Sequence, residues 1–431
     1  MSLLIAAPAS GSGKTTVTLG LLRALAQDGV PVRGAKSGPD YIDPRFHAAA
    51  CGRPCLNLDA WAMGPDRLAA LAAPGPLIVE GAMGLFDGAP PDGRGASADI
   101  ARALGLPVVL VIDAGRMAQS VAPLALGFAR HDPAVRIAGV ILNRVGSDRH
   151  AAMLTSALDR AGLPVLGALP RDPALALPSR HLGLVQAGEH PDLAAFLDRA
   201  AEAVRNGCDL PAIAALLAPL PARTAPRVPP PAQRIAVARD EAFAFAYPHL
   251  LDDWRAGGAE VTVFSPLSDD PVQDADFVYL PGGYPELHAG RLSANSAFLR
   301  SLRDAAERGT PVYGECGGYM VLGDGLTDAG GDRHAMAGLL RLETSFADRR
   351  LHLGYRTLAC AEGPLAGHWT GHEFHYATTL RAEGAPLFAA RDAEGTALPP
   401  MGLRTGSVFG SFAHVIDRAW TAPEPPDTAA S

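Results

Sequence analysis

The sequence predicts an α/β protein of two domains, each built on a largely parallel sheet. In the first half of the chain, short apolar runs bounded by Pro or Gly alternate with helical patterns. Continuous apolar strands separated by helices are typical of a parallel sheet covered on both faces. This order breaks in a Pro-rich segment near the middle of the chain and then resumes. A chain of 431 residues is also too long for one ordinary core.

The elements expected in the first domain begin at the N-terminus. Residues 14–28 are expected to form a helix that ends at Gly29, because glycine commonly follows the last turn of a helix. The expected strands share an apolar character and flanking Pro or Gly; they are 2–7, 31–36, 76–82, 107–114 and 137–143.

A Pro-rich segment separates the two halves. Residues 219–233 contain closely spaced prolines and little apolar periodicity. Because Pro removes backbone donors and stiffens the chain, such a segment is typical of an interdomain linker. Strand patterns resume at 234–240, 259–266, 276–283 and 311–318. We therefore expect a first domain over 1–208, a linker over 209–233 and a second domain over 234–431.

The composition excludes several classes of protein. Hydrophobic residues make up 48% and charged residues 19% of the chain, which is the balance of a folded globular protein. The apolar runs are too short to span a bilayer, which takes about 20 residues. No basic region precedes an apolar run at the N-terminus, so no signal peptide is expected. A formal net charge of −8 argues against a nucleic-acid partner.

The five cysteines have no repeating spacing and do not make a disulfide framework. Cys51 and Cys55 are four residues apart, but no second Cys or His pair at zinc spacing accompanies them. Ordinary thiols are therefore favoured over a metal site. Together with the absence of a signal peptide, this cysteine usage indicates a cytoplasmic protein.

The stretch 11-GSGKTT-16 lies between the first expected strand and the first expected helix. There, backbone N–H groups can surround a phosphate, Lys14 can reach its outer oxygens and Thr15 can ligate Mg²⁺. The full phosphate-loop pattern has Gly where this chain has Pro8. The sequence predicts a nucleotide site, and the alternative is a glycine-rich turn that caps a helix.

Several carboxylates follow the ends of the neighbouring strands. Asp40 and Asp43 come after the second strand, Glu80 ends the third, and Asp87 lies in the loop that follows. Because the ends of parallel strands face one crevice, these carboxylates are candidate Mg²⁺ ligands beside the phosphate loop. A turn or helix-capping role is the alternative for Asp40 and Asp43. Asn143 ends a further strand and could contact an adenine edge or occupy a turn.

The second half contains a cysteine at an expected strand-to-helix turn. The motif 314-GECGGYM-320 is the thiol counterpart of a nucleophile elbow, in which glycines permit the strained turn and the N–H of Gly317 can stabilise an oxyanion. The loop 281-PGGYPE-286 is suited to the same task or to substrate binding. His414, after a strand-like run, is the candidate base for Cys316.

His372 and His375 are three residues apart and could bind a metal if they lie on a helix. No third ligand is evident in the sequence. Substrate or structural contacts are therefore favoured for this pair.

Taken together, these motifs resemble the cobyrinic and hydrogenobyrinic acid a,c-diamide synthase family. The first half resembles a dethiobiotin-synthetase-type ATP domain, and the second half resembles a class I glutamine amidotransferase domain of the cobyric-acid-synthase type. Eight matches in the same order carry the resemblance over nearly the whole chain. They are 11-GSGKTT-16, 36-KSGPDYIDPRFH-47, 79-VEGAMGLFDG-88, 180-RHLGLV-185, 235-IAVARDEAFAF-245, 281-PGGYPE-286, 314-GECGGYM-320 and 371-GHEFHYA-377.

The resemblance implies ATP-dependent amidation of two carboxylates on a corrin-ring precursor, with glutamine as the nitrogen donor. ATP would turn each carboxylate into an acyl phosphate, which ammonia released at Cys316 would attack. The residues implied for ATP binding are Gly11, Ser12, Gly13, Lys14, Thr15, Thr16 and Asn143. Those implied for Mg²⁺ are Thr15, Asp40, Asp43 and Glu80; those for the reacting carboxylate are Tyr41 and Asp87. Those implied for the glutaminase reaction are Cys316 and His414, with Gly282, Gly283 and Gly317 for glutamine and its oxyanion.

The chain departs from the resemblance at one position. Many class I amidotransferases carry a Glu two residues after the catalytic His, but Ile416 stands there in this sequence. Only a Cys–His dyad is therefore expected, and the third group stays open. One ATP site used for both amidations is also expected, and a homodimer is among the assemblies that the sequence allows.

Three other functions are alternatives to a,c-diamide synthesis. A partitioning or septum-positioning ATPase would carry a signature Lys five residues before Lys14, where this chain has Ala9. A cobyric acid synthase or a ligase for a nickel tetrapyrrole would carry out the same ATP- and glutamine-dependent amidation. It would act on other side chains or on a different tetrapyrrole. A non-catalytic scaffold would need neither the phosphate loop nor the cysteine elbow.

Overall fold

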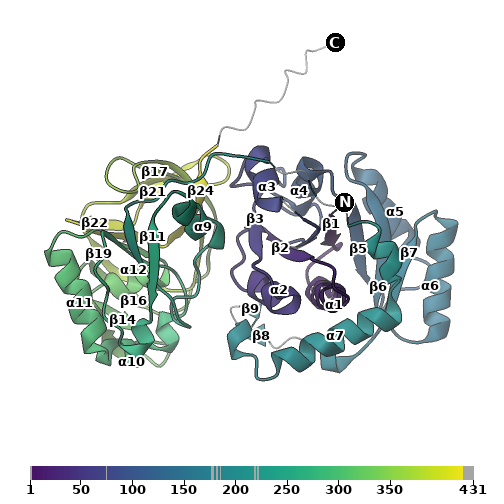
Figure 1. Ribbon diagram of the computed structural model, residues 1–431, viewed down its shortest axis with the longest axis horizontal. Coiled ribbons are helices and arrows are strands. Elements are labelled where there is room, and N and C mark those ends of the chain that lie inside the picture. The colour runs from purple at the N-terminus through teal and green to yellow at the C-terminus, as the bar shows by residue number, and fades with distance from the viewer. Residues whose placement is uncertain are drawn as a thin grey trace, which may run out of the picture. The chain divides into compact units, whose positions relative to one another are not determined.

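The computed structural model describes residues 2–73, 75–175, 179–180, 183–184, 186–217, 220 and 223–420. The chain divides into two compact units, Met1–Pro226 and Arg227–Ser431. Figure 1 shows that both units combine sheets with surrounding helices, which confirms the α/β class that the sequence predicts.

The first unit is built on a seven-stranded sheet in the order β3-β2-β4-β1-β5-β6-β7. Every neighbouring pair in this sheet is parallel. The strands are β1 (Leu3–Ala6), β2 (Arg33–Ser37), β3 (Leu56–Leu58), β4 (Leu77–Glu80), β5 (Val108–Asp113), β6 (Ile137–Val145) and β7 (Val165–Pro170). The carboxyl ends of all seven therefore meet at one edge of the sheet.

Helices cover both faces of this sheet, as Figure 1 shows. They are α1 (Lys14–Gln27), α2 (Asp43–Cys51), α3 (Pro65–Ala72), α4 (Ser97–Leu104), α5 (Val121–His131), α6 (Asp148–Arg160), α7 (Leu193–Gly207) and α8 (Leu210–Ala214). Smaller elements are the 3₁₀ turns Pro173–Leu175 and Ala187–Glu189 and the strands β8 (Ser179–Arg180) and β9 (Gly183–Leu184).

Two hydrophobic clusters explain why the sheet is buried on both sides. One joins the apolar faces of α1, α2 and α7 to the central strands, and the other joins α5 and α6 to β5 and β6. The strands read as continuous apolar runs because both of their faces are covered. This packing fixes the strand ends from which the candidate residues of the first unit project.

The segment expected as a linker begins with the short helix α8. The Asp209 side chain accepts a hydrogen bond from Ala212 N and caps its first turn. Ile213 is buried in the same cluster as α1 and α7. The residues 210–214 therefore pack as part of the first unit. Of the motif 180–185, residues 181, 182 and 185 lie outside the described residues.

The second unit contains a six-stranded sheet in the order β11-β10-β12-β13-β23-β22, parallel except for the last strand. Its strands are β10 (Arg234–Ala238), β11 (Glu260–Phe264), β12 (Phe277–Leu280), β13 (Val312–Glu315), β22 (Leu403–Thr405) and β23 (Val408–Ser411). Its helices are α9 (Pro248–Ala256), α10 (Ala289–Ala294), α11 (Ser296–Glu307) and α12 (Gly317–Leu322), with 3₁₀ turns η3 (Pro266–Ser268) and η4 (Pro285–Leu287).

Two further sheets complete the second unit. The order β15-β14-β16-β19 is formed by β14 (Gly325–Thr327), β15 (Arg333–Ala335), β16 (Arg341–Ser345) and β19 (Thr378–Glu383). The antiparallel order β21-β20-β17-β18-β24 is formed by β17 (His352–Cys360), β18 (Gly367–His375), β20 (Phe388–Arg391), β21 (Ala397–Met401) and β24 (Ala413–Arg418).

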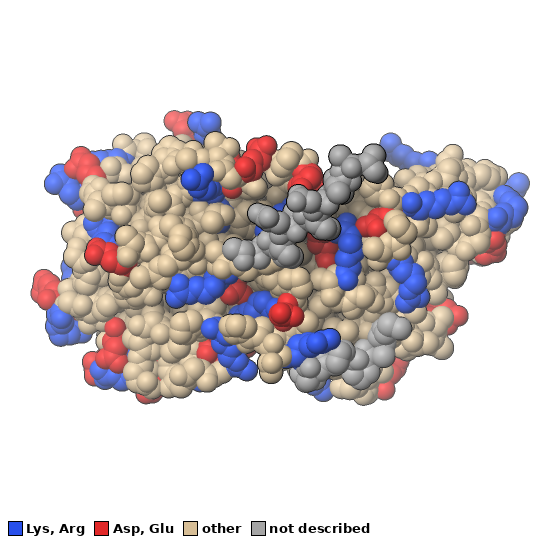
Figure 2. All heavy atoms as spheres, turned by 90° about the horizontal axis from the view of Figure 1, so that it is seen from above, with Lys and Arg blue, Asp and Glu red and all other residues tan. Residues whose placement is uncertain are grey.

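The surface carries charges of both signs. Figure 2 shows Lys and Arg side chains interspersed with Asp and Glu side chains over the face seen there. Among the described residues, no helix is both long enough and apolar enough to cross a membrane.

Candidate active sites

The phosphate loop connects β1 to α1 at the carboxyl edge of the first sheet. Gly13 adopts a left-handed conformation with φ 93°, which favours glycine. A Cβ atom there would lie 2.1 Å from Asn143 Nδ2, so the position is closed to a side chain. Asn143 Nδ2 donates a 2.9 Å hydrogen bond to Ser12 O, and its Oδ1 accepts from Arg144 N. In this structure Asn143 braces the loop; contact with an adenine edge stays a prediction.

Lys14 is the first residue of α1, and its side chain is buried in the loop. Its Nζ donates a 2.5 Å hydrogen bond to Met83 O, in the loop after β4. Burial and the neighbouring Lys36 ammonium lower the pKa of Lys14.

The other polar side chains of the phosphate loop donate hydrogen bonds to backbone oxygens. Ser12 Oγ donates to Ala9 O, and Thr16 Oγ1 donates to Leu175 O. Gly11, like Gly13, has positive φ.

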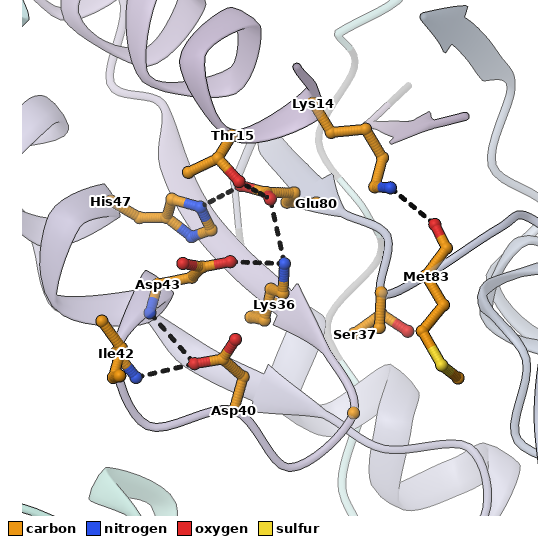
Figure 3. Close-up of polar contacts among 12 residues, drawn as sticks. Lys14, Thr15, Lys36, Ser37, Asp40, Ile42, Asp43, His47, Glu80 and Met83 are labelled. Carbon is orange, nitrogen blue, oxygen red and sulfur yellow. Dashed lines mark hydrogen bonds and ion pairs between the residues drawn. The ribbon is translucent and has the colours of Figure 1, made fainter. Parts of the chain in front are cut away.

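A compact polar cluster lies beside the loop, as Figure 3 shows. Thr15 Oγ1 donates to Glu80 Oε1 at 2.6 Å. Lys36 Nζ lies 2.9 Å from the same Glu80 oxygen and 2.5 Å from Asp43 Oδ2. His47 Nε2 lies 2.7 Å from Glu80 Oε2. Four separate elements, α1, α2, β2 and β4, thus contribute side chains to this cluster around the Glu80 carboxylate.

The charges of this cluster are set by burial and by close pairing. Burial opposes ionisation of Glu80, but Lys36, His47 and Thr15 outweigh it and lower the pKa of Glu80. Burial likewise opposes the charge of Lys36, yet Asp43 and Glu80 raise the pKa of Lys36. Burial and the nearby Asp40 raise the pKa of Asp43. Glu80 and Lys36 therefore form a charged pair that is almost inaccessible to water.

The other predicted carboxylates also have local structural partners. Asp40 Oδ1 accepts from the backbone N–H groups of Ile42 and Asp43, so it caps the start of α2. Asp87 Oδ2 accepts from Gly84 N. Tyr41 is half-buried in the same loop as Asp40. The structure brings Thr15, Asp43 and Glu80 together, whereas Asp40 and Asp87 hold turns at its margin.

The donor set in this cluster fits a magnesium ion. Mg²⁺ prefers carboxylate and hydroxyl oxygens, and the Thr15 hydroxyl, Asp43 and Glu80 supply oxygens of both kinds. Thr15 and Glu80 already lie within 2.6 Å of one another. These three side chains could hold the ion beside the Lys14 ammonium.

Two residues of this site received no role in the sequence analysis, namely Lys36 and His47. Both stand in the motif 36-KSGPDYIDPRFH-47, but neither carries a signal by itself. A usable signal was the spacing from Asp43 to His47, because residues four apart lie on one face of a helix. Helix α2 begins at Asp43, so both side chains face the cluster.

The elbow in the second unit has the strained geometry that its glycines predict. Cys316 lies between β13 and α12 with φ 46° and ψ −103°, which a residue with a side chain rarely adopts. Its N–H donates to Ser411 O, at the end of the neighbouring strand β23. Burial raises the pKa of the Cys316 thiol, whereas the backbone N–H of Gly317 lowers it.

The His414 imidazole lies beside this elbow, at the start of β24. A Cβ atom at Gly282 would be 2.3 Å from His414 Cε1 and 3.3 Å from Cys316 Cβ, so glycine there lets thiol and imidazole approach the same point. Burial, together with the neighbouring His372 and His375, lowers the pKa of His414 to about 3. The imidazole is therefore neutral at ordinary pH and able to accept a proton.

A buried carboxylate lies near His414, although the sequence did not reveal a third member of the Cys316–His414 catalytic set. Glu315 Oε2 lies 3.8 Å from His414 Nδ1, and both side chains are 2% exposed. The same carboxylate accepts hydrogen bonds from Tyr279, Tyr313 and Val415 N. Burial raises the pKa of Glu315 to about 7, against the effect of these donors. The residue was missed because it precedes the nucleophile and does not follow the histidine.

The expected oxyanion loop packs directly against the elbow. A Cβ atom at Gly317 would lie 3.0 Å from Gly283 N and 2.8 Å from Pro285 Cδ. Gly282, Gly283 and Gly317 thus surround the cysteine with closely approaching backbone. Their role in binding glutamine stays a prediction.

His372 and His375 lie on strand β18, so the helix considered for them is wrong. Residues three apart on a strand point to opposite faces: His372 pairs with His414, whereas His375 stacks on Phe412. His352, Glu373 and His375 have ligand-type atoms within 4.8 Å of one another. Glu373, however, is already paired with Arg356 and His375, which supports the structural alternative.

Comparison with known proteins defines the class first. The family described as "CobQ/CobB/MinD/ParA nucleotide binding domain" matches residues 3–185, and the "CobB/CobQ-like glutamine amidotransferase domain" matches residues 234–419. The two folds and these matches define a glutamine-dependent, amide-forming ligase with a nucleotide-binding domain.

Full-length relatives then identify the particular family. A protein of Brucella anthropi named hydrogenobyrinate a,c-diamide synthase is 57% identical over 428 residues, covering 96% of this chain and 98% of the relative. Relatives of the same name from Sinorhizobium sp. and Rhodobacter capsulatus are 58% and 55% identical. They cover 97% and 96% of this chain, and 99% and 98% of their own lengths. The chain belongs to the hydrogenobyrinate a,c-diamide synthase family.

Proposed function

We propose that this enzyme amidates the a and c carboxylates of a hydrogenobyrinate-type corrin precursor in cobalamin biosynthesis, using ATP and glutamine. The observation that carries the proposal is the full-length similarity, at 57% identity, to a protein named for this reaction. The phosphate loop in one unit and the cysteine elbow in the other supply the two half-reactions that such an amidation needs.

The first unit activates the carboxylate. A carboxylate is a poor electrophile, and phosphoryl transfer from ATP converts it to an acyl phosphate with release of ADP. Lys14 and the loop N–H groups hold the phosphates and spread their negative charge. Thr15, Asp43 and Glu80 would hold Mg²⁺, which would supply further charge neutralisation. Lys36 favours the ionised forms of Asp43 and Glu80 and holds both side chains in position.

The second unit releases the nitrogen. His414 takes the proton from Cys316, and the thiolate attacks the side-chain amide carbon of glutamine. The N–H of Gly317 and the 282–283 backbone bind the oxyanion. The proton then moves to the leaving nitrogen, which departs as ammonia and leaves a γ-glutamyl thioester. Water hydrolyses the thioester to glutamate, and ammonia displaces phosphate from the acyl phosphate to form the amide.

Glu315 completes this proton relay as a positioning residue. Its carboxylate lies 3.8 Å from His414 Nδ1 and favours the imidazolium that forms when the thiol loses its proton. The Glu that follows the catalytic His in many class I amidotransferases is replaced here by Ile416. We propose that Glu315, which directly precedes Cys316 in the sequence, orients His414 in place of that Glu.

The ring specificity is tested by mass spectrometry of the products. Metal-free hydrogenobyrinate and cobalt-containing cobyrinate are offered separately, with ATP, Mg²⁺ and glutamine. Two amides on the metal-free ring, formed in sequence at one ATP site, are expected. Amidation of the cobalt ring alone, of a nickel tetrapyrrole, or of side chains other than a and c would overturn the assignment.

We further propose a cytoplasmic location, where ATP and glutamine are abundant and thiols stay reduced. All five cysteines are free, among them Cys51 and Cys55, whose sulfur atoms lie 3.7 Å apart. A homodimer stays a prediction, and the mass measured by light scattering tests it.

A further inference from the structure

Glu286 is a half-buried acidic residue beside the elbow that the mechanism above does not use. It lies in the 3₁₀ turn η4, at the end of the loop 281-PGGYPE-286. This turn packs against α12, which begins directly after Cys316. A Cβ atom at Gly317 would touch Pro285 Cδ at 2.8 Å. The residues next to Glu286 and next to Cys316 are therefore in contact.

The Glu286 carboxylate lacks a compensating partner in the part of the chain that the structure describes. Its Oε2 is buried and makes no hydrogen bond there. Burial raises the pKa of Glu286 to about 7, and only its own backbone N–H opposes the shift. Burying a carboxylate without a cation is costly. Glu286 can therefore bind a cationic group that the described part of the chain does not supply.

The same carboxylate acts on the nucleophile. After burial, Glu286 is the charged group that most strongly raises the pKa of Cys316, ahead of Glu315 and Glu373. A negative charge close to a thiol disfavours the thiolate. Glu286 therefore keeps the cysteine protonated as long as its own charge is uncompensated.

We propose that Glu286 binds the α-ammonium group of glutamine and couples substrate binding to activation of Cys316. Glutamine carries a cationic ammonium at one end and the reactive amide at the other. With the amide at the elbow, the ammonium is directed to the adjoining turn that carries Glu286. Pairing compensates the buried carboxylate and removes the charge that opposes the thiolate. The thiol thus becomes nucleophilic when the correct donor is bound.

This inference rests on the glutaminase assignment of Cys316, and its test uses an analogue without the cation. Glutaramate has the same side-chain amide and carboxylate as glutamine but no α-amino group. In the full-length enzyme, kcat/KM for hydrolysis of glutamine should exceed that of glutaramate by about 100-fold, since losing one partner of a buried charge pair has effects of this size. Equal values for the two amides would overturn the proposal without any variant.

The variant Glu286→Gln keeps the size of the side chain and removes its charge. It should lower kcat/KM for glutamine by about 100-fold, mostly through KM, whereas kcat/KM for glutaramate should not fall and should rise, because the charge that opposes the thiolate is gone. Its free Cys316 should also react faster with iodoacetamide at fixed pH. Parallel losses for both amides would assign Glu286 a merely structural role.

Two controls separate this inference from the proposed function. Leu287→Ala changes an exposed neighbour in the same turn and should keep the preference for glutamine. Glutaminase activity that survives Cys316→Ala would refute the assignment of the nucleophile itself. Loss of activity there, with no glutamine preference in the wild type, would refute only the role of Glu286.

Discussion

Both sites lie at a turn that follows a parallel strand, but they differ in the charge of their side chains. The first site contains charged side chains, whereas the nucleophile and base of the second are neutral. In the first unit, the Lys36 ammonium lies within 2.9 Å of carboxylate oxygens of both Asp43 and Glu80, and the Lys36–Glu80 pair is charged. In the second, burial favours the neutral forms of both Cys316 and His414. Phosphoryl transfer needs fixed charges that are ready before ATP arrives. A thiol that stays neutral until its substrate binds is protected from side reactions.

The largest expected effect comes from removing the Lys14 ammonium from the phosphate loop. Lys14→Ala should lower amidation by at least about 1000-fold, with glutamine or with ammonia as donor, because carboxylate activation is common to both. Initial rates with each donor measure it. Arg23→Ala, on the exposed side of the same helix, is the matched control. Full activity of the Lys14 variant would refute the phosphate-loop assignment.

Glu80→Gln should damage both activity and stability. The variant leaves Lys36 and His47 without their shared carboxylate, and breaking a buried pair costs about 3–5 kcal/mol. Because pairing lowers the pKa of Glu80, its stabilisation is present above the pKa of an unfolded Glu, about 4.3, and is lost as the pH falls below it. Urea unfolding should show this acid-side loss in the wild type and a weaker one in the variant. Identical pH profiles would contradict the pairing.

In the neutral site, Glu315→Gln should reduce kcat for glutamine hydrolysis by about 10- to 100-fold with little change in KM, because the orientation of His414 is weakened. Ammonia-dependent amidation should be unaffected. Tyr279→Phe removes one of three hydrogen bonds to the same carboxyl group but keeps that group, so it should have the smaller effect. A loss confined to KM would argue against a positioning role for Glu315.

The smallest expected effect is at Asn143. Asn143→Ala removes the bond to Ser12 O and should raise KM for ATP by about tenfold or less, since one hydrogen bond contributes about 1 kcal/mol. The preference for ATP over GTP should be unchanged, because both ends of the amide group already bond to the chain. Loss of the preference for ATP over GTP would indicate that the main role of Asn143 is contact with adenine.

The sequence allowed prediction of those features that have a local signature. Apolar runs bounded by Pro and Gly identified β1, β2, β4, β5 and β6 of the first sheet and β10, β11, β12 and β13 of the second, but not β3, β7 or the two further sheets of the second unit. The glycines around Lys14 and Cys316 marked the two turns. The positions of Asp43 and Glu80 followed from the rule that strand ends share one edge, and His414 was chosen because it follows a strand-like run after the elbow.

Features that depend on tertiary approach could not be predicted in this way. Lys36 and His47 gain their roles only because α2 and the ends of β2 and β4 meet at Glu80. Glu315 approaches His414 because β13 lies beside β23, which leads into β24, across about 100 residues of sequence. The helix considered for His372 and His375 was wrong because their spacing suits either element, and pairing of β18 with β17 and β24 decides it.

The most direct test of the two-site scheme is amidation by Cys316→Ala with each nitrogen donor. Glutamine-dependent amidation should disappear, whereas amidation with added ammonium salt should stay near the wild-type rate, because only the source of nitrogen is lost. Cys360→Ala, a buried thiol on β17, is the control. Loss of both activities in a folded Cys316 variant, or retention of glutamine-dependent amidation, would contradict the division of labour between the two units.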